Sequence, residues 1–373
     1  MSESSSLDDL LGSVARMLAS NPALRARIAF VDILPNGAPA EANGSALNAP
    51  TNGAGLVTPK FNFEGHSVIA YVAERYLDLN DQATFQALQS VKANDPLARG
   101  DIGEFAGWPD KLKHDPALEA ERQRLGGTRS FWHYINIPYD PANPDQEFDL
   151  ATISGDLLKQ LPQQLDLLAN PDPLTAADAL CFALHLVGDL HQPLHCAAYA
   201  DGQYFSTPPE YDQGGNLVRW GKDAPRSQNL HALWDDSIAA SGANVASRVD
   251  EVMRDHPIES FSAGDLAKDV DAIALETFAL AKDAYNKFFA EVTYQGPSSA
   301  TKGGQQFSPP SPQYRADARE ICRRQAALGG YRLAHLLAEH LGQATGTARS
   351  RRHGSTARKA AKKGPAKKAR SRR

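Results

Sequence analysis

Apolar residues recur at the three- and four-residue spacing of an amphipathic helix along most of the chain. This pattern predicts helices over residues 68–77, 149–168, 176–190, 230–240, 265–292 and 314–340, with a further short helix over 7–18. The alternation of apolar and polar residues that is typical of strands is scarce. The sequence therefore predicts an all-α fold.

Composition divides the chain into three parts. Residues 35–60 are rich in Pro, Gly, Ala, Asn and Thr, as linkers are, and residues 295–312 have the composition of a loop. We expect a flexible N-terminal extension and linker over 1–60, a helical domain over 61–345, and a disordered basic tail over 346–373.

The charge distribution is uneven. The formal net charge is −5, yet residues 349–373 contain 12 of the 39 Lys and Arg residues and no acidic residue. The rest of the chain therefore has 27 basic against 44 acidic residues. A block of like charge usually forms an interaction tail, and this one would bind polyanions, nucleic acid included. A tail that only aids solubility is the alternative.

Three further features bear on the compartment. No run of 18 apolar residues occurs, so no transmembrane segment is predicted. The first residues are acidic and lack the basic and apolar regions of a signal peptide, so the sequence as it stands predicts a cytoplasmic protein. An odd count of three cysteines argues against a disulfide framework. Cys181 and Cys322 are expected to be buried, and Cys196, which follows His195, is a candidate to line a site.

The strongest chemical signal is the run that contains His185, Asp189 and His195. His185 and Asp189 are four residues apart, so on a helix both project from one face and can share a cation. Pro193 cannot continue that helix, which should turn nearby and bring His195 to the same region. Two residues at the turn are candidates to support the ligands, namely His191 and Gln192.

A second pair, His231 and Asp235, repeats the four-residue spacing. Burying a His–Asp pair is costly unless a metal or other partners satisfy it. A set of His and Asp ligands without cysteine suits hydrolytic zinc, which lowers the pKa of bound water and neutralises phosphoryl charge. Four upstream residues are further candidates, although each alone is more often structural: His66, Asp110, Lys113 and His133.

Taken in order, these motifs resemble those of the trinuclear-zinc single-strand nucleases of fungi and plants, the S1/P1 nucleases, which are relatives of bacterial zinc phospholipase C. The resemblance covers roughly residues 61–235. It rests on the following segments: Gly-His66, Gly-Trp-Pro-Asp110, Trp-His133-Tyr-Ile-Asn, His185-Leu-Val-Gly-Asp189-Leu-His-Gln-Pro-Leu-His195, Gly214-Gly-Asn216 and His231-Ala-Leu-Trp-Asp235.

The resemblance implies a multi-helix phospholipase C/single-strand nuclease-like fold and two to three zinc ions. The first zinc would be bound by Asp110, His133, His185 and Asp189. The second would be bound by His195, His231 and Asp235. The third would be bound by His66 together with Asp189, which would bridge two sites.

The resemblance also implies an activity. A metal-activated water would hydrolyse phosphodiester bonds of single-stranded RNA or DNA to 5′-nucleotides, in a protein that is expected to be a monomer. The implied catalytic residues are Asp110, Lys113 and Asp189. The implied substrate-binding residues are Lys113, Tyr134, Asn136, Gly214, Gly215 and Asn216. Tyr134 would stack on a base and Asn136 would read its edge.

Phe61 departs from the family pattern. It takes the place of a tryptophan that is the mature N-terminus in the family, where its amine and its carbonyl oxygen bind the third zinc. Phe61 is internal in this sequence. We hypothesise either that cleavage between Lys60 and Phe61 frees the amine, or that the third site is weakened.

Two rival functions remain open at this stage. A zinc-dependent phospholipase C would use the same ligands on a lipid head group, although Tyr134, Asn136 and the basic tail favour nucleic acid. An impaired relative that only binds nucleic acid is the second rival. The retained side-chain ligands argue against it.

Overall fold

The computed structural model describes residues 61–342, except 207, 209–210, 222–227, 239–243 and 300. The described residues fall within one compact unit. The predicted helix over 7–18, the extension over 1–60 and the basic tail over 346–373 lie outside the described residues.

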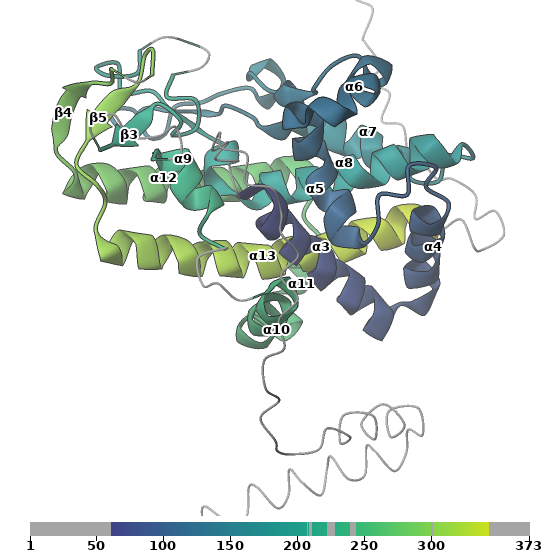
Figure 1. Cartoon of the computed structure of the whole chain (residues 1–373). Helices are drawn as coiled ribbons and strands as arrows, with labels where there is room; N and C mark the ends of the chain where they lie inside the picture. Colours follow the sequence, from purple (N-terminus) through teal and green to yellow (C-terminus); the bar gives the residue numbers. More distant parts are fainter. Residues whose placement is uncertain are drawn as a thin grey trace, which may run out of the picture. The chain divides into compact units, whose positions relative to one another are not determined.

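The described domain is all-α with a few short strands (Figure 1). Its α-helices are α3 (Phe61–Asn80), α4 (Gln82–Ala93), α5 (Ile102–His114), α6 (Glu119–Leu125), α7 (Leu157–Leu167), α8 (Pro173–His191), α9 (Leu230–Asp235), α10 (Val245–Asp255), α11 (Ala263–Leu266), α12 (Val270–Glu291) and α13 (Pro312–Leu341). Its 3₁₀ turns are η1 (Pro116–Leu118), η2 (Ser130–His133), η3 (Leu150–Thr152), η4 (Pro193–His195) and η5 (Ile258–Ser260).

Helix α8 is the central element of the core. Its N-cap Asp172 accepts a hydrogen bond from the backbone N–H of Thr175 at 3.0 Å, and Pro173 occupies the first turn, where its missing N–H is tolerated. Every residue from Ala176 to His191 is buried, so the helix is enclosed on all sides. The helix ends at His191 because Pro193 follows, as the sequence predicted.

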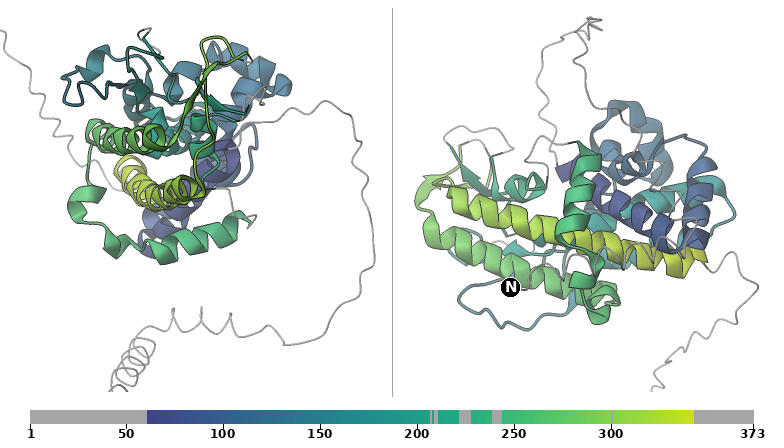
Figure 2. Two further views of the ribbon diagram at one scale, coloured as in Figure 1. Left: turned by 90° about the vertical axis from the view of Figure 1, so that its left-hand side faces the viewer. Right: turned by 90° about the horizontal axis from the view of Figure 1, so that it is seen from below.

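The other long helices enclose α8. Helix α3 packs against α5 and α13, while α5, α7, α12 and α13 contact α8. Helices α12 and α13 run side by side in Figure 1, and the end-on view in Figure 2 shows the same arrangement. Residues far apart in sequence therefore meet along α8.

A buried polar network joins three of these helices. Arg332 on α13 is 1% exposed, and its Nη1 donates to His191 Nε2 at 3.0 Å while its Nη2 lies 2.9 Å from Glu276 on α12. His191 Nδ1 donates to the carbonyl of Val187 at 2.7 Å. Burial and the neighbouring Arg332 lower the pKa of His191 to about 3, so this imidazole is neutral and structural.

Several predicted helices are shorter than expected. The helix predicted over 149–168 begins only at Leu157, because Asp149 caps the short turn η3 and Gly155 adopts a positive φ of 104°. The helix predicted over 265–292 is split by a second N-cap, Asp269, which accepts from Ala272 N at 2.8 Å. Helix α9 ends at Asp235, whereas the prediction ran to residue 240.

Four helices were missed, namely α4, α5, α6 and α10. Helix α5 carries Pro109 in its interior, and α6 has the mostly polar sequence Glu-Ala-Glu-Arg-Gln-Arg-Leu. Helix α6 shows no clear apolar stripe, so periodicity alone does not reveal it. Helix α5 has apolar residues at helical spacing, but it contains a proline, which usually interrupts a helix.

The segment 295–312, predicted to be a loop, contains two short strands. Strand β4 (Tyr294–Pro297) pairs antiparallel with β5 (Gln305–Phe307), and β3 (Val218–Trp220) adds to β5 in parallel. A second pair, β1 (Pro138–Tyr139) and β2 (Ala198–Tyr199), is also parallel. These strands depend on partners far away in sequence, so their own residues carry little strand signal.

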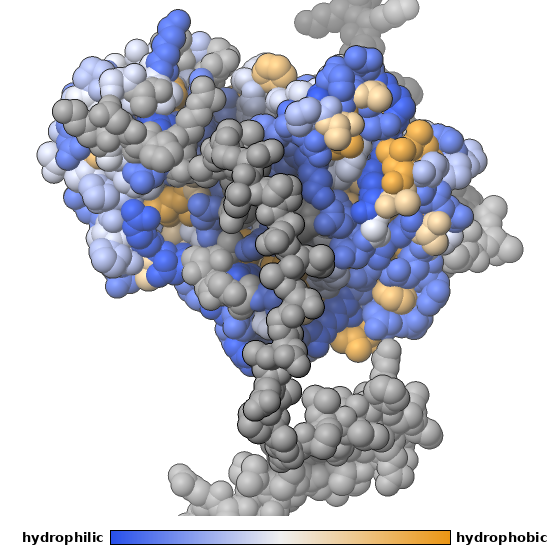
Figure 3. Space-filling view, in the orientation of Figure 1, coloured by the Kyte–Doolittle hydropathy of each residue, from blue (hydrophilic) through white to orange (hydrophobic). Residues whose placement is uncertain are grey.

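The surface is mostly polar. In the face shown in Figure 3, hydrophilic residues predominate and the apolar residues form small separate groups. Few large apolar side chains are exposed among the described residues: Leu79, Leu97, Phe131, Leu167, Leu275 and Tyr294. All three cysteines are buried and free, which confirms the prediction for Cys181 and Cys322. The thiol of Cys196 donates to the carbonyl of Leu190 at 3.5 Å in the core.

Among the described residues, α8 alone is long and apolar enough to cross a bilayer, and 83% of its apolar stretch is buried inside the domain. This burial, with polar residues such as His185 and Asp189 in its interior, is what a core helix shows.

Close packing of α3 on α13 makes a prediction for Gly330. A Cβ on Gly330 would lie 2.5 Å from the Cβ of Val72, so G330A should lower the free energy of unfolding by about 1–3 kcal/mol. G264A is the matched control, because its nearest neighbour would be Ser262 Oγ at 3.7 Å. Denaturant unfolding measures both. Equal stability of G330A and wild type would contradict this packing.

Candidate metal centre

The carboxylate of Asp189 lies at the centre of the candidate site. Asp189 is 1% exposed, and four imidazole rings surround it. Its Oδ1 is 3.4 Å from His66 Nε2 and 3.2 Å from His195 Nδ1. Its Oδ2 is 3.0 Å from His133 Nδ1 and 3.3 Å from His185 Nε2. Four segments of the chain therefore converge on one buried carboxylate.

A first group of ligand atoms comes from α5, η2 and α8. His185 Nε2 lies 2.8 Å from His133 Nδ1 and 3.7 Å from Asp110 Oδ1. Asp110 projects from α5, where Lys113, one turn later, places its Nζ 2.6 Å from Asp110 Oδ1. One ligand atom from each of Asp110, His133 and His185 lies within 4.8 Å of the others, close enough to hold one metal ion.

A second group comes from η4 and α9. His195 Nε2 lies 3.5 Å from Asp235 Oδ1, and His231 Nε2 lies 3.4 Å from Asp235 Oδ2. The two imidazole rings stack with centroids 4.8 Å apart. The four-residue spacing of His231 and Asp235 thus places both on one face of α9, as the sequence predicted.

His66 on α3 completes a third group with His185 and Asp189. Its ring stacks on that of His185, with centroids 3.7 Å apart. The ring also lies against Gly188, where a Cβ would be 2.3 Å from His66 Nδ1. Helix α3 begins at Phe61, but its side chain lies outside what the structure describes, so the third-site hypothesis for Phe61 stays a prediction.

Backbone carbonyls fix the orientation of three of the histidines. The Nδ1–H of His185 donates to the carbonyl of Ala106 at 2.8 Å, that of His195 to His133 at 2.7 Å, and that of His231 to Gly214 at 2.8 Å. Each bond uses Nδ1 as the donor, so Nε2 is the nitrogen that lies beside a carboxylate of the cluster. Metal-ligating histidines commonly use their second nitrogen in this way.

The buried polar atoms of the cluster fit a cation. Neither carboxylate oxygen of Asp189 makes a hydrogen bond of standard geometry within the described structure, and neither does Nε2 of His133. Burying a carboxylate without compensation costs several kcal/mol, about 3–5 when one partner of a buried pair is lost. A divalent ion held by oxygen and imidazole nitrogen ligands would remove that cost, and the ligand set suits such an ion.

The protonation of the cluster favours metal binding at most ligands. Burial lowers the pKa values of His66 and His133 to about 3, so both imidazoles are neutral. Burial alone would raise the pKa of Asp110, but Lys113 and neighbouring histidines hold it well below its usual range. Burial would also raise the pKa of Asp189, but His185, His195 and His133 outweigh burial and hold it low.

Gln192 supports the second group. Its Nε2 donates to Asp235 Oδ1 at 2.7 Å, and its Oε1 accepts from the backbone N–H of Leu194 at 2.5 Å. The amide therefore orients the Asp235 carboxylate, which is the supporting role that the sequence allowed for Gln192. His191, the other candidate, instead belongs to the Arg332 network.

Asp212 was missed by the sequence reasoning, although it precedes the Gly-Gly-Asn segment by two residues. Its buried Oδ1 accepts from the N–H groups of Tyr199 and Gly214, at 2.7 and 3.1 Å. Its Oδ2 accepts from the N–H of Gly215 at 2.8 Å and the hydroxyl of Tyr285 at 2.7 Å. Burial raises the pKa of Asp212 to about 7, and the four donors oppose that rise.

The loop that Asp212 holds positions His231. Gly214 and Gly215 have positive φ values of 61° and 86°. A Cβ on Gly214 would lie 2.4 Å from the carbonyl oxygen of Leu194, so only glycine fits there. The Gly214 carbonyl accepts from His231, and the amide of Asn216 donates to the carbonyl of Gln213 at 2.9 Å. The contacts of this loop are thus with a metal-ligand candidate and with its own backbone.

The predicted base-binding residues lie directly after His133. Ile135 and Ile137 are buried at 1% and 0% exposure, and they alternate with Tyr134 and Asn136 in an extended segment. Successive side chains of an extended chain project to opposite sides, so Tyr134 and Asn136 project away from the Ile pair. Backbone hydrogen bonds hold the segment, from Ile135 N to the His195 carbonyl and from Asn136 N to the Ser154 carbonyl, both at 2.8 Å.

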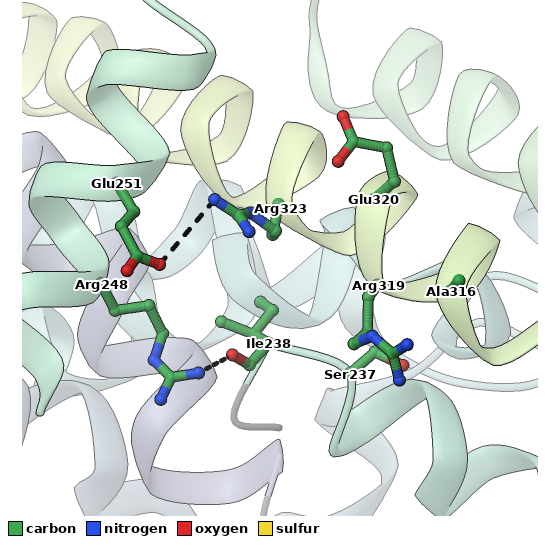
Figure 4. Close-up of a pocket in the computed structure, with 8 residues that line it drawn as sticks. All are labelled: Ser237, Ile238, Arg248, Glu251, Ala316, Arg319, Glu320 and Arg323. Atoms are coloured by element: carbon green, nitrogen blue, oxygen red, sulfur yellow. Dashed lines mark hydrogen bonds and ion pairs between the residues drawn. The ribbon is translucent and has the colours of Figure 1, made fainter. Parts of the chain in front are cut away.

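A cavity of about 270 Å³ lies apart from these ligands, between α10, α13 and the segment after α9 (Figure 4). Its lining residues include Arg248, Arg319 and Arg323 together with Glu251 and Glu320. Arg248 is engaged with the carbonyl of Ile238 and Arg323 with Glu251 and Asp255. None of the candidate metal ligands lines this cavity.

Comparison with known proteins identifies relatives. A family model described as S1/P1 Nuclease matches residues 61–342. The chain is 27% identical to Endonuclease 4 of Arabidopsis thaliana over 191 aligned residues. This alignment covers 48% of this chain and 55% of that protein. It is 24% identical over 182 residues to Nuclease S1 of Aspergillus oryzae, an alignment that covers 48% of this chain and 54% of that protein. It is 27% identical over 176 residues to Nuclease P1 of Penicillium citrinum, an alignment that covers 46% of this chain and 55% of that protein. The chain thus spans about half the length of the curated relatives it matches.

The electrostatics of His195 predict proton release when a metal binds. Burial opposes the charge on this ring, but Asp189 and Asp235 outweigh burial and raise its pKa to about 9. His195 is therefore protonated at neutral pH, and a metal binds only the neutral ring. Zinc titration of the metal-free protein should release about one proton near pH 7 and progressively less above pH 9. Calorimetry in buffers of different ionisation enthalpy measures this, and a heat that is independent of the buffer would contradict it.

The loop held by Asp212 makes a second prediction. In D212N an NH₂ group replaces one acceptor oxygen, so Gly214 or Gly215 loses its partner and His231 loses its fixed support. We expect the zinc affinity of the second group to fall by roughly 10- to 100-fold. Y285F removes only one of the four donors and should have a smaller effect.

Competition with a chromogenic chelator measures this affinity for wild type, D212N and Y285F. A lower melting temperature of D212N with unchanged zinc affinity would mean that Asp212 only stabilises the fold.

Proposed function

The chain belongs to the S1/P1 nuclease family, and we propose that it is a zinc-dependent phosphodiesterase that hydrolyses single-stranded RNA or DNA to 5′-nucleotides. The observation that carries the proposal is the buried Asp189 carboxylate, on which imidazoles from α3, η2, α8 and η4 converge. The similarity of the chain to relatives named as nucleases and endonucleases supports the substrate class.

We propose that the ligand groups hold two to three zinc ions. Asp110, His133 and His185 would bind one ion with help from Asp189. His195, His231 and Asp235 would bind another. His66 and Asp189 would contribute to a third, completed by the Phe61 amine if cleavage after Lys60 frees it. Bound zinc supplies an activated water and neutralises the charge of a phosphoryl group.

Residues of the chain itself would position the substrate. The Lys113 ammonium pairs with Asp110, so a cation that binds Asp110 would compete for this carboxylate and leave Lys113 available to a phosphate oxygen. Tyr134 directly follows the ligand candidate His133 in the chain, so its aromatic ring would lie near the first ligand group. An aromatic ring stacks on any base, so Tyr134 would hold the base while Asn136 contacts its edge.

We further propose that the enzyme acts as a monomer, and that the basic segment after residue 346 raises its affinity for polyanionic substrates. Lys and Arg contacts with phosphates release counterions, so this contribution should weaken as salt rises.

Substitution of Asp189 tests the proposal. Wild-type protein should contain two to three zinc ions per chain and hydrolyse single-stranded DNA and RNA. D189N removes the charge shared by the ligand groups and should lower hydrolysis by more than roughly 100-fold, since even partners of metal ligands contribute about 10- to 100-fold. D166N is the matched control, because the Asp166 side chain is 80% exposed on α7.

Elemental analysis and hydrolysis assays on single-stranded nucleic acid and on phosphatidylcholine measure both properties. Hydrolysis of phosphatidylcholine alone would establish a phospholipase instead. Nucleic-acid binding by a protein without zinc or hydrolysis would establish a binding protein.

A further inference from the structure

Phe131 is the most exposed of the large apolar side chains in the described part of the chain, with 62% of its surface accessible. It lies on the 3₁₀ turn η2, two residues before the metal-ligand candidate His133. A single exposed apolar residue is common on protein surfaces. Its place beside the ligand group is what makes Phe131 informative.

The backbone around Phe131 is firmly held. The carbonyl of Phe131 accepts from Asp156 N at 2.7 Å, and the N–H of Trp132 donates to the Arg129 carbonyl at 2.9 Å. The next ring, Trp132, packs edge-on against Phe182 with centroids 4.8 Å apart, and the Arg129 guanidinium lies 4.9 Å from its centroid. The Phe131 ring is therefore presented to solvent by an anchored turn.

Phe131 and Tyr134 form an aromatic pair. Phe131 lies in the turn and Tyr134 directly follows it, and these two rings lie with centroids 6.2 Å apart at 50°. The backbone of Gly155 lies so close to Tyr134 that a Cβ would be 2.2 Å from the Tyr134 carbonyl oxygen, so Tyr134 is closely packed on this side. The rings of Phe131 and Tyr134 thus lie at a defined spacing from each other, on residues that flank His133 in the chain.

We propose that Phe131 is a stacking platform for a second nucleobase, next to the base that contacts Tyr134. The proposal rests on the proposed nuclease function and extends its substrate site beyond one nucleotide. Successive bases of a single strand stack on aromatic side chains, and every base offers a flat face for this contact. A base inside a duplex is already stacked and paired, so the Phe131 platform favours an unpaired strand.

The platform also links base binding to the site of hydrolysis. Phe131, His133 and Tyr134 belong to one anchored segment, so a base that stacks on Phe131 is held at a fixed position relative to the first ligand group. Such positioning lowers the entropy loss of bringing a phosphate to that group.

Substitution of Phe131 tests the platform in the zinc-loaded, full-length protein. F131A should raise KM for a single-stranded oligonucleotide by roughly 5- to 150-fold, the equivalent of about 1–3 kcal/mol for one stacked base. The increase should exceed that for a dinucleotide, which offers fewer bases. F131W and F131Y retain a ring and should retain most of the affinity. L79A is the matched control, because Leu79 is 58% exposed at the opposite end of α3 from His66.

A second measurement identifies the base that stacks. Oligonucleotides that carry one abasic position at successive sites are assayed with wild type and F131A. At one position, loss of the base should raise KM for wild type but have little further effect on F131A, because both changes remove the same contact. A merely structural role of Phe131 would give additive effects at every position.

The outcomes separate the two proposals. If wild type hydrolyses single strands while F131A shows the same KM values and additive abasic effects, the platform is wrong and the nuclease function stands. If wild type hydrolyses no nucleic acid, the proposed function fails and the platform fails with it. Zinc content and melting temperature of F131A, compared with F131W, distinguish a lost contact from a disturbed turn.

Discussion

The constraint on which the domain depends is the burial of the Asp189 carboxylate among four imidazole rings. A charge with 1% exposure is strongly unfavourable in an apolar core unless other groups compensate for it. Asp189 lies on helix α8, which is buried on all sides at the centre of the domain. Elements α3, η2 and η4 each contribute a histidine that lies beside its carboxylate. The same arrangement that would penalise the metal-free fold suits a cation, so binding of an ion would be coupled to the stability of the fold.

The orientation of the ligands is determined mainly by main-chain atoms. The carbonyls of Ala106, His133 and Gly214 accept from the Nδ1–H groups of His185, His195 and His231, so helix and loop packing fixes which nitrogen would be available to an ion. One of these carbonyls belongs to a loop that depends on a further buried carboxylate, Asp212. Asp212 accepts hydrogen bonds from four donors, one of which is the Gly214 N–H. Without Asp212 the Gly214 peptide would lose this bond, and its carbonyl would no longer be a fixed support for His231.

Local spacing predicted the parts of the site that local geometry controls. The His–Asp pairs four residues apart and the turn at Pro193 lie as expected, and the ordered motifs pointed to the family. The role of Asp212 was not predictable, because its donors come from residues 199 to 285 and only the folded chain brings them together. Helix α5 was missed although its apolar residues recur at helical spacing: it contains Pro109, which usually interrupts a helix, and packing against α3 and α8 stabilises it. The exposure of Phe131 likewise depends on tertiary contacts of its neighbours.

The turn η2 contains both a metal-ligand candidate and the exposed aromatic residue proposed to bind a base. Its last residue, His133, faces Asp189, while Phe131 in the same turn faces solvent. The backbone of this segment is held by hydrogen bonds from Asp156 N to the Phe131 carbonyl and from Ile135 N to the His195 carbonyl. In the proposed function, base recognition and metal coordination would therefore be linked through four consecutive residues, 131–134. If a base stacks on Phe131 as proposed, a shift of that base would move the strand relative to His133, so binding at this turn would contribute to alignment of the phosphate.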